Sequence, residues 1–261
     1  MLILPLLLLF GTPAVFSQIA SIHFAEAFPE LCIWVNGLPL VMAEGAEQVR
    51  VSRWEESPEE GVYSAGYTEF DYVGNFLIRK SGYTEAGERE YTMTYIYDDG
   101  YLVRMEYDFP LYNSVTLYYY DHYEDRIEIY TSDAKSKNPD REWLKTLRYD
   151  EKNYLTEIEG PDWSRIFYYD DGFLVRAEET WSGDTTTTIY TYTDTALLES
   201  ISLQDEYRIT LSYNDDSTVA GVRLEPFFRT ELSGNLQVTR NSRGDISRIG
   251  PTTIDWTYRE Q

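Results

Sequence analysis

The 261-residue chain has few residues that bind transition metals or form disulfides, because it contains one cysteine and two histidines. One cysteine excludes an internal disulfide, and so few soft ligands exclude a zinc cluster. Positive charge is also scarce: 22 Lys and Arg stand against 45 Asp and Glu, giving a net charge of −23. Nucleic acids and anionic membrane surfaces attract clustered Lys and Arg, so we expect neither as a partner.

Long hydrophobic runs are lacking except at the N-terminus. Residues 1–17, MLILPLLLLFGTPAVFS, carry no charge and contain two prolines. The uninterrupted run is shorter than the roughly 20 residues of a spanning helix, and a small residue ends the segment. We interpret residues 1–17 as a signal peptide cleaved after Ser17, with an uncleaved anchor as the alternative. This predicts a secreted or periplasmic cell-envelope protein with no integral membrane span in the mature chain.

Tyrosine is abundant, with 24 residues, and much of it belongs to an internal repeat. The repeat consists of Tyr-Asp, a turn and an aliphatic residue, and its copies lie roughly 24 residues apart. Two copies, Tyr97–Arg104 (YDDGYLVR) and Tyr169–Arg176 (YDDGFLVR), differ at one position. The acidic or amide residues of the eight copies are Asp71, Asp98, Asp121, Asp150, Asp170, Asp194, Asn214 and Asn241.

Each copy predicts a strand, a turn and a second strand. Alternating β-preferring residues precede the turn, as in Tyr91–Tyr97, and Gly100 and Gly172 supply positive φ within it. The next strand begins with an aliphatic triplet that often ends in arginine. We expect these arginines to pair across strands with acids such as Glu106 and Glu178. Eight copies predict about sixteen strands and almost no helix.

The copies resemble the YD repeats of the RHS family, whose consensus is close to Y-x-Y-D-x-x-G-x-L, over about residues 63–250. In that family the repeats form long antiparallel β-ribbons, which in large members wind into a shell around a toxic cargo. This chain is too short for a large shell and lacks the family's Asp-Pro-Gly-Leu boundary. The resemblance therefore implies a fold and not a toxin. We predict an all-β protein, an elongated or curled antiparallel sheet of repeated β-hairpins over residues 63–261.

Residues 18–62 match no repeat. Within them, Ile33–Leu40 predicts a hairpin about Asn36-Gly37. We interpret this region as an N-terminal cap that covers the first edge of the sheet. We also weighed an outer-membrane barrel, which about sixteen amphipathic strands would suit. We do not predict one, because strands such as Thr185–Thr188 are polar on both faces and residues 256–261 lack a terminal aromatic.

Aromatic residues before each turn share one face of their strand and form the candidate binding set. Two interpretations stay open: they are the packed side of the sheet, or an exposed platform that stacks sugar rings. The set comprises Tyr95, Tyr97, Tyr118, Tyr120, Tyr149, Phe167, Tyr169 and Tyr213.

The sequence predicts no catalytic residue, no cofactor and no metal. His122 has acids nearby, but no Gly-x-Ser-x-Gly elbow supplies a nucleophile. His23 and Cys32 lie in apolar stretches and are predicted to be packed. Acidic pairs such as Asp98-Asp99 lack the alternating spacing of a calcium loop and are interpreted as turn caps.

These observations predict a non-catalytic binding or scaffold module of the bacterial envelope. Repetition multiplies weak contacts along an extended partner. A polysaccharide is the first partner expected, and a protein that adds an edge strand to the sheet is the second. The alternative function is an acidic glycan-degrading enzyme, which two converging carboxylates would indicate. The sequence does not indicate an oligomeric state.

Overall fold

Strands make up most of the computed structural model, which describes residues 22–35, 38–40, 44–57, 61–136, 140–204, 206–226 and 234–259. The expected signal peptide, residues 1–17, lies outside these ranges. Residues 22–27 are helical, and η2 (Pro29–Leu31) and η3 (Pro110–Tyr112) are single 3-10 turns. The strands are β1 (Ile33–Val35), β2 (Leu38–Leu40), β3 (Ala46–Ser57), β4 (Gly61–Val73), β5 (Phe76–Tyr83), β6 (Arg89–Asp98), β7 (Tyr101–Phe109), β8 (Ser114–His122), β9 (Arg126–Asp133), β10 (Glu142–Tyr149), β11 (Leu155–Glu159), β12 (Trp163–Asp170), β13 (Phe173–Trp181), β14 (Asp184–Tyr192), β15 (Leu198–Leu203), β16 (Tyr207–Tyr213), β17 (Val219–Pro226), β18 (Gly234–Arg240), β19 (Ile246–Ile249) and β20 (Thr252–Tyr258).

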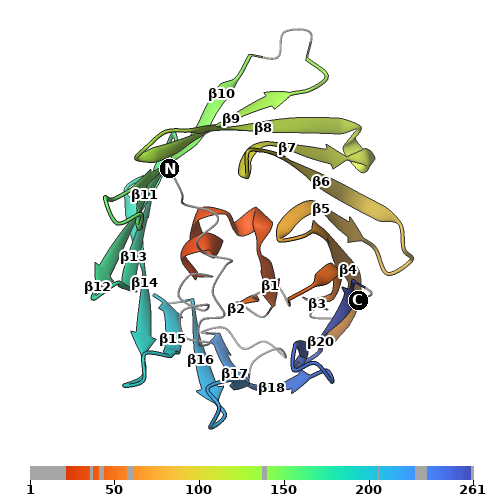
Figure 1. Ribbon diagram of the computed structural model, residues 1–261, viewed down its shortest axis with the longest axis vertical. Helices are drawn as coiled ribbons and strands as arrows, with labels where there is room; N and C mark the ends of the chain where they lie inside the picture. The colour runs from red at the N-terminus through yellow and green to blue at the C-terminus, as the bar shows by residue number, and fades with distance from the viewer. Residues whose placement is uncertain are drawn as a thin grey trace.

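The wall formed by β3 to β20 is a closed antiparallel barrel (Figure 1). Its last strand pairs with its first, with Ile254 opposite Val51 and Trp256 opposite Val49. The protein is therefore all-β, but our prediction of an elongated or curled open sheet is wrong. Closure also leaves the wall without the free edge that we expected a cap to cover and a protein partner to extend.

A β-bulge that recurs with the repeat explains the closure. Ile96 pairs with Arg104 whereas Tyr97 pairs with Leu102, so Val103 is an extra residue in its strand. Bulges bend a strand and increase its right-handed twist, and sheets are curved in this way. Seven of them curl the wall until β20 meets β3. The extra residues are Ile78, Val103, Thr156, Val175, Glu199, Ala220 and Ser247.

The turns have the chemistry that the repeat predicts. Asp99 and Gly100 have φ of 49° and 81°, and the same turn recurs at Asp171-Gly172 with φ of 46° and 85°. Positive φ at both central residues is the mark of a type I′ hairpin, whose twist matches that of the strands. In longer turns the repeat's acid acts as a cap: Asp150 Oδ1 accepts the backbone N–H of Lys152 and of Tyr154, each at 2.9 Å.

The interior of the barrel is occupied by the described residues of segment 22–40, which we call the plug (Figure 1). A wall of this many strands encloses more space than its own side chains fill. The plug consists of the helical residues 22–27, η2 and the predicted hairpin, confirmed by Ile33 opposite Leu40 and Val35 opposite Leu38. The hairpin's turn lies outside the described residues. The buried plug side chains are Ile22, Ala25, Ala27, Phe28, Cys32, Ile33, Val35 and Leu38.

One core joins the plug to the inward face of the wall. Four fully buried residues from different parts of the wall belong to the same cluster as Phe28 of the plug: Val49, Leu147, Leu174 and Ile249. The alternate residues of the strands point outward, and this face carries ion pairs such as Arg104–Glu106 together with exposed apolar side chains such as Ile166 and Ile189. No helix among the described residues is long and apolar enough to cross a membrane.

Candidate functional site

The eight aromatic residues of the candidate binding set pack into the interior. Tyr95, Tyr120 and Phe167 are buried, with exposed fractions of 3%, 3% and 4%. The remaining five are partly buried against the same core or belong to its margin: Tyr97, Tyr118, Tyr149, Tyr169 and Tyr213. The sequence left two interpretations open for these residues, and their position is that of the packed side of the sheet. A ligand-binding role for them stays a prediction.

The last aromatic residue before each turn makes a hydrogen bond that recurs around the wall. Tyr97 donates its hydroxyl to the carbonyl oxygen of Leu77 at 3.0 Å, and Leu77 begins the aliphatic triplet of the preceding copy. Five further pairs repeat this bond: His122 Nε2 with Leu102 O (2.7 Å), Tyr169 with Leu155 (2.6 Å), Tyr192 with Leu174 (3.0 Å), Tyr213 with Leu198 (2.5 Å) and Trp256 Nε1 with Ile246 (2.7 Å).

The strand register explains why this bond is needed. The backbone ladder between β5 and β6 ends where Arg79 faces Thr94, so Leu77 lies beyond its end. A buried carbonyl without a donor is costly, and Tyr97, three residues past Thr94, supplies one. The donor lies three residues past the end of the ladder in all six pairs. This side chain therefore joins neighbouring hairpins at the end of the barrel that carries the repeat turns.

We expect Tyr97→Phe to destabilise the fold by about 1–3 kcal/mol, because the ring stays and the Leu77 carbonyl loses its donor. Urea unfolding followed by tryptophan fluorescence measures the change. Tyr123→Phe is the matched control, since Tyr123 is 47% exposed, and its effect should stay within about 0.5 kcal/mol. Equal unfolding midpoints for the two variants would contradict a structural role for the hydroxyl.

Two glutamates that the sequence analysis missed join the plug to the wall. Glu26 Oε2 lies 2.8 Å from Arg165 Nη1, and its Oε1 accepts the Tyr190 hydroxyl at 2.6 Å. Glu30 Oε1 accepts the hydroxyl of Tyr120 at 3.2 Å. A signal was present in the sequence: Glu26 and Glu30 are the only charged residues between positions 18 and 43.

His23 of the plug is packed, as predicted. Its ring lies 5.0 Å from that of Tyr169 and 5.7 Å from that of Tyr154, centroid to centroid, and its Nε2 is buried without a partner among the described residues. Burial lowers the pKa of His23 from 6.5 to about 4.

This pKa shift predicts a loss of stability in mild acid. Above pH 6.5 His23 is neutral in both states, so it contributes no pH dependence. Between pH 6.5 and pH 4 the unfolded chain binds a proton that the folded chain does not, which lowers the free energy of unfolding by up to about 3 kcal/mol. Urea unfolding at pH 7 and pH 4.5 should therefore show a smaller pH effect in His23→Phe than in the wild type. An equal pH effect in both proteins would remove His23 as a cause.

A cavity of about 360 Å³ lies between the plug and the wall. Ligand pockets range over roughly 300–1,000 Å³, so the volume suits a small molecule or the end of a larger one. The plug supplies Cys32, Trp34 and Val35, and the wall supplies residues of β3, β4, β5, β6 and β20. Trp34 is 39% exposed, so the lining reaches solvent at this side chain.

Aromatic rings and hydroxyl groups dominate the lining. The rings are those of Trp34, Trp54, Phe70 and Tyr91, and the hydroxyls are those of Ser52, Thr68 and Thr252. The Tyr91 ring lies against Gly82 on the neighbouring strand, where an added Cβ would come within 2.2 Å of its Cε1. Glycine at this position therefore lets the ring lie against the wall. Flat apolar faces beside hydroxyls are suited to the two sides of a sugar ring.

Two cations line the same cavity, and their partners differ. Arg53 forms an ion pair with Glu90 and donates to the carbonyl oxygens of Ala65 and Tyr83 at 3.2 and 2.6 Å. Lys80 has much weaker partners.

The Lys80 ammonium lies 3.4 Å from the Glu30 carbonyl oxygen and 5.4 Å from the centroid of the Phe70 ring. Within the described part of the chain, no carboxylate lies within ion-pair distance of it. Burial lowers the pKa of Lys80, and the Glu30 carboxylate, whose charge favours the ammonium form, offsets this only in part.

Cys32 is buried, as predicted, and belongs to the cavity lining. Burial raises the pKa of its thiol to about 12, so the thiol is protonated at neutral pH.

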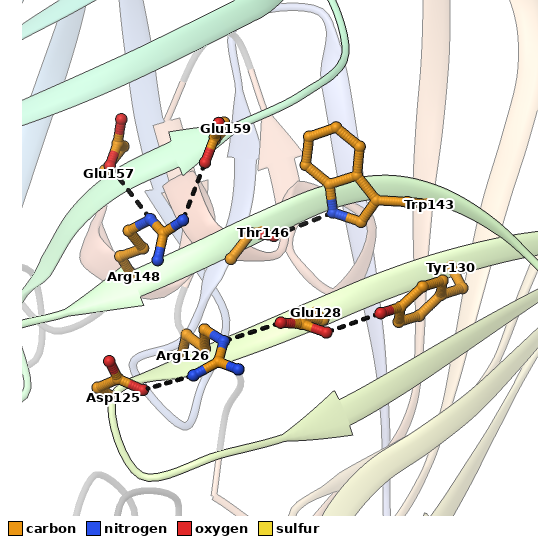
Figure 2. A network of polar contacts seen from close by, with 9 residues as sticks. All are labelled: Asp125, Arg126, Glu128, Tyr130, Trp143, Thr146, Arg148, Glu157 and Glu159. Atoms are coloured by element: carbon orange, nitrogen blue, oxygen red, sulfur yellow. Dashed lines mark hydrogen bonds and ion pairs between the residues drawn. The ribbon is translucent and has the colours of Figure 1, made fainter.

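The outer face of the wall carries ion pairs, of which Figure 2 shows those on β9, β10 and β11. Arg126 Nε donates to Glu128 Oε1 at 2.8 Å, and Glu128 also accepts the Tyr130 hydroxyl at 2.7 Å. On the neighbouring strands, Arg148 lies 3.4 Å from Glu157 and 3.0 Å from Glu159. The hydrogen bond from Arg126 lowers the pKa of Glu128.

Two of the ion pairs that we expected across strands lie along single strands. Arg104 pairs with Glu106 at 2.9 Å, and Arg176 pairs with Glu178 at 3.4 Å. Residues two apart on a strand point to the same face, so each pair stays on the outer surface. The expected cross-strand geometry is wrong for these two pairs, whereas Arg79 pairs across strands with Asp71 at 2.7 Å, as predicted.

The remaining candidates for chemistry have structural partners. The Nε2 of His122 is bonded to Leu102 O, as described above. Among the described residues, no three His, Cys, Asp or Glu side chains gather into a group that could hold a metal ion.

No protein-family model and no curated protein matches the chain. Among solved structures, a porin-like protein from Bacteroides uniformis is similar with a TM-score of 0.42 and 10% identity, over 82% of this chain and 98% of that one. A chain of the TcdB2-TccC3-Cdc42 structure gives a TM-score of 0.33 and 10% identity, over 70% of this chain. This chain spans only 13% of that one. Scores this low carry no argument about function.

Proposed function

We propose that the chain is an exported, non-catalytic binding protein whose cavity holds part of a polysaccharide. The observation that carries the proposal is the lining of the cavity, where Trp34, Trp54 and Tyr91 lie beside three hydroxyl side chains. Rings of this kind stack on the apolar faces of sugars, and hydroxyls exchange hydrogen bonds with them. The ligand is held by the plug, β3 to β6 and β20, and not by the ladder of repeat tyrosines.

The ion pairs on the outer face of the wall support the proposal that the barrel is surrounded by water and not by lipid. A barrel embedded in lipid presents an apolar band outward, whereas this wall presents pairs such as Arg104–Glu106 and Arg223–Glu225. Its apolar face is turned inward against the plug. We therefore propose a secreted or periplasmic location, and we retain the YD-repeat likeness as part of this proposal.

A glycan array tests the function with the full mature chain. We expect the wild type to retain a defined group of glycans, and Trp34→Ala and Trp54→Ala to weaken retention roughly 10-fold or more, since each loses the apolar contact of one large side chain, worth about 1.5–3 kcal/mol when fully buried. Trp181→Ala is the matched control, because Trp181 is 57% exposed, stacks on Trp163 and does not line the cavity. Retention unaffected by the two cavity variants while both stay folded would contradict the site.

The same glycans distinguish binding from hydrolysis. After prolonged incubation with the wild type, we expect the retained glycans to be recovered intact by mass spectrometry. Release of shorter products would instead support the alternative, an acidic glycan-degrading enzyme, and would end the proposal of a non-catalytic module.

A further inference from the structure

The repeat allows Lys80 to be compared with its equivalents in the same chain. Lys80 lies three residues after Leu77, which begins an aliphatic triplet. The residue at this position in six other copies is apolar and at most 7% exposed: Met105, Ile158, Ala177, Ile201, Val222 and Ile249. Among these seven copies of the repeat, only the copy with Lys80 has a cation at this position, where the other six have a buried apolar side chain.

This exception has an energetic cost that the charge of Glu30 offsets only in part. The ammonium is partly buried, and its one hydrogen bond is a 3.4 Å contact with the Glu30 carbonyl oxygen. Burying a charge without a close partner is unfavourable, and a residue that breaks a local rule without a structural gain marks a functional position. Lys80 lies in the lining of the aromatic cavity, which is the site of the proposed function.

We propose that Lys80 binds the carboxylate of an acidic sugar, so that the ligand of the cavity is a glycan containing a uronic or similar carboxylate-bearing residue. This inference rests on the proposed function and specifies its ligand class. A single negative charge matches the lining, because Arg53 is already paired with Glu90, whereas Lys80 has no carboxylate within ion-pair distance among the described residues and feels the charge of Glu30 only from farther away. The rings of Trp54 and Tyr91 would then hold the sugar that carries the carboxylate.

The test compares one glycan in two charge states. The acidic glycan best retained on the array is titrated calorimetrically against the mature chain, both as the free acid and as its methyl ester. Esterification removes the charge and leaves the sugar ring in place. We expect the wild type to bind the acid roughly 10- to 100-fold more tightly than the ester, the value of a hydrogen bond to a charged group.

Lys80→Met reproduces the residue that the fold places at position 105. We expect this variant to bind the acid and the ester equally, at the affinity of the wild type for the ester, and to melt at a higher temperature than the wild type. If Lys80→Met is more stable than the wild type but no longer prefers the acid to the ester, Lys80 serves ligand recognition and not folding. Lys152→Met is the control for net charge, because Lys152 is an exposed turn residue, and it should keep the preference for the acid.

Three outcomes would overturn the inference. An array that retains only neutral glycans would exclude the acidic ligand while leaving the proposed function in place. A preference for the acid that survives in Lys80→Met would assign recognition to another residue. An array that retains no glycan would remove the proposed function and this inference together.

Discussion

A mature chain that lacks residues 22–40 is expected to lose cooperative unfolding. The plug contributes six buried side chains to the shared core, Phe28 and Ile33 among them. Removing one large buried side chain costs about 2–5 kcal/mol, so removal of the plug exceeds the roughly 5–15 kcal/mol of a typical domain. We expect the variant to keep β-rich far-ultraviolet dichroism, lose the near-ultraviolet signal and bind a hydrophobic dye.

A synthetic peptide of residues 22–40 should restore the near-ultraviolet signal when it is added to the deletion variant. The matched control is the same peptide with Phe28→Ala, which should need a concentration at least roughly 100-fold higher, because that change costs about 3–5 kcal/mol. If the deletion variant unfolds cooperatively at the wild-type midpoint, the barrel does not need the plug and this account of the core is wrong.

The elements formed by neighbouring residues could be predicted from the sequence. The Asp99-Gly100 turn follows from the need for positive φ at both positions, and the strands on either side follow from alternation. The hairpin Ile33–Leu40 was visible for the same reason. In each case the residues that determine the structure are adjacent in the chain.

Closure and the plug could not be predicted in this way, because they depend on distant residues. The Leu102-Val103-Arg104 triplet has the alternation of an ordinary strand, and only its pairing with Tyr97 shows that Val103 is a bulge. The bond between Glu26 and Tyr190 spans 164 residues and exists only when the wall has closed around the plug. A segment that fills a barrel and one that caps a sheet edge have the same apolar composition.

The candidate site was partly visible in the sequence. Alignment of the copies shows Lys80 where Met105 and Ala177 stand, but the significance of the lysine depends on knowing that this position points inward. Trp34 and Trp54 lie outside the repeat, so no internal comparison marks them. The repeat tyrosines attracted the prediction instead, because repetition makes a residue conspicuous whether it serves folding or binding.

Arg165→Met is expected to destabilise the fold by about 3–5 kcal/mol, because it leaves the Glu26 carboxylate, 12% exposed, without its cation. The Tyr190 hydroxyl still donates to Glu26 but does not neutralise it. Adding Glu26→Gln to Arg165→Met removes both charges and should recover most of the loss, a coupling that a double-mutant cycle of urea midpoints measures. Arg176→Met is the control: its guanidinium is 42% exposed and pairs with Glu178 on the outer face, so we expect a change of about 0–1 kcal/mol. Equal losses in Arg165→Met and Arg176→Met would show that the ion pair does not hold the plug, whereas a large loss in the first and recovery in the double variant would assign that role to the pair.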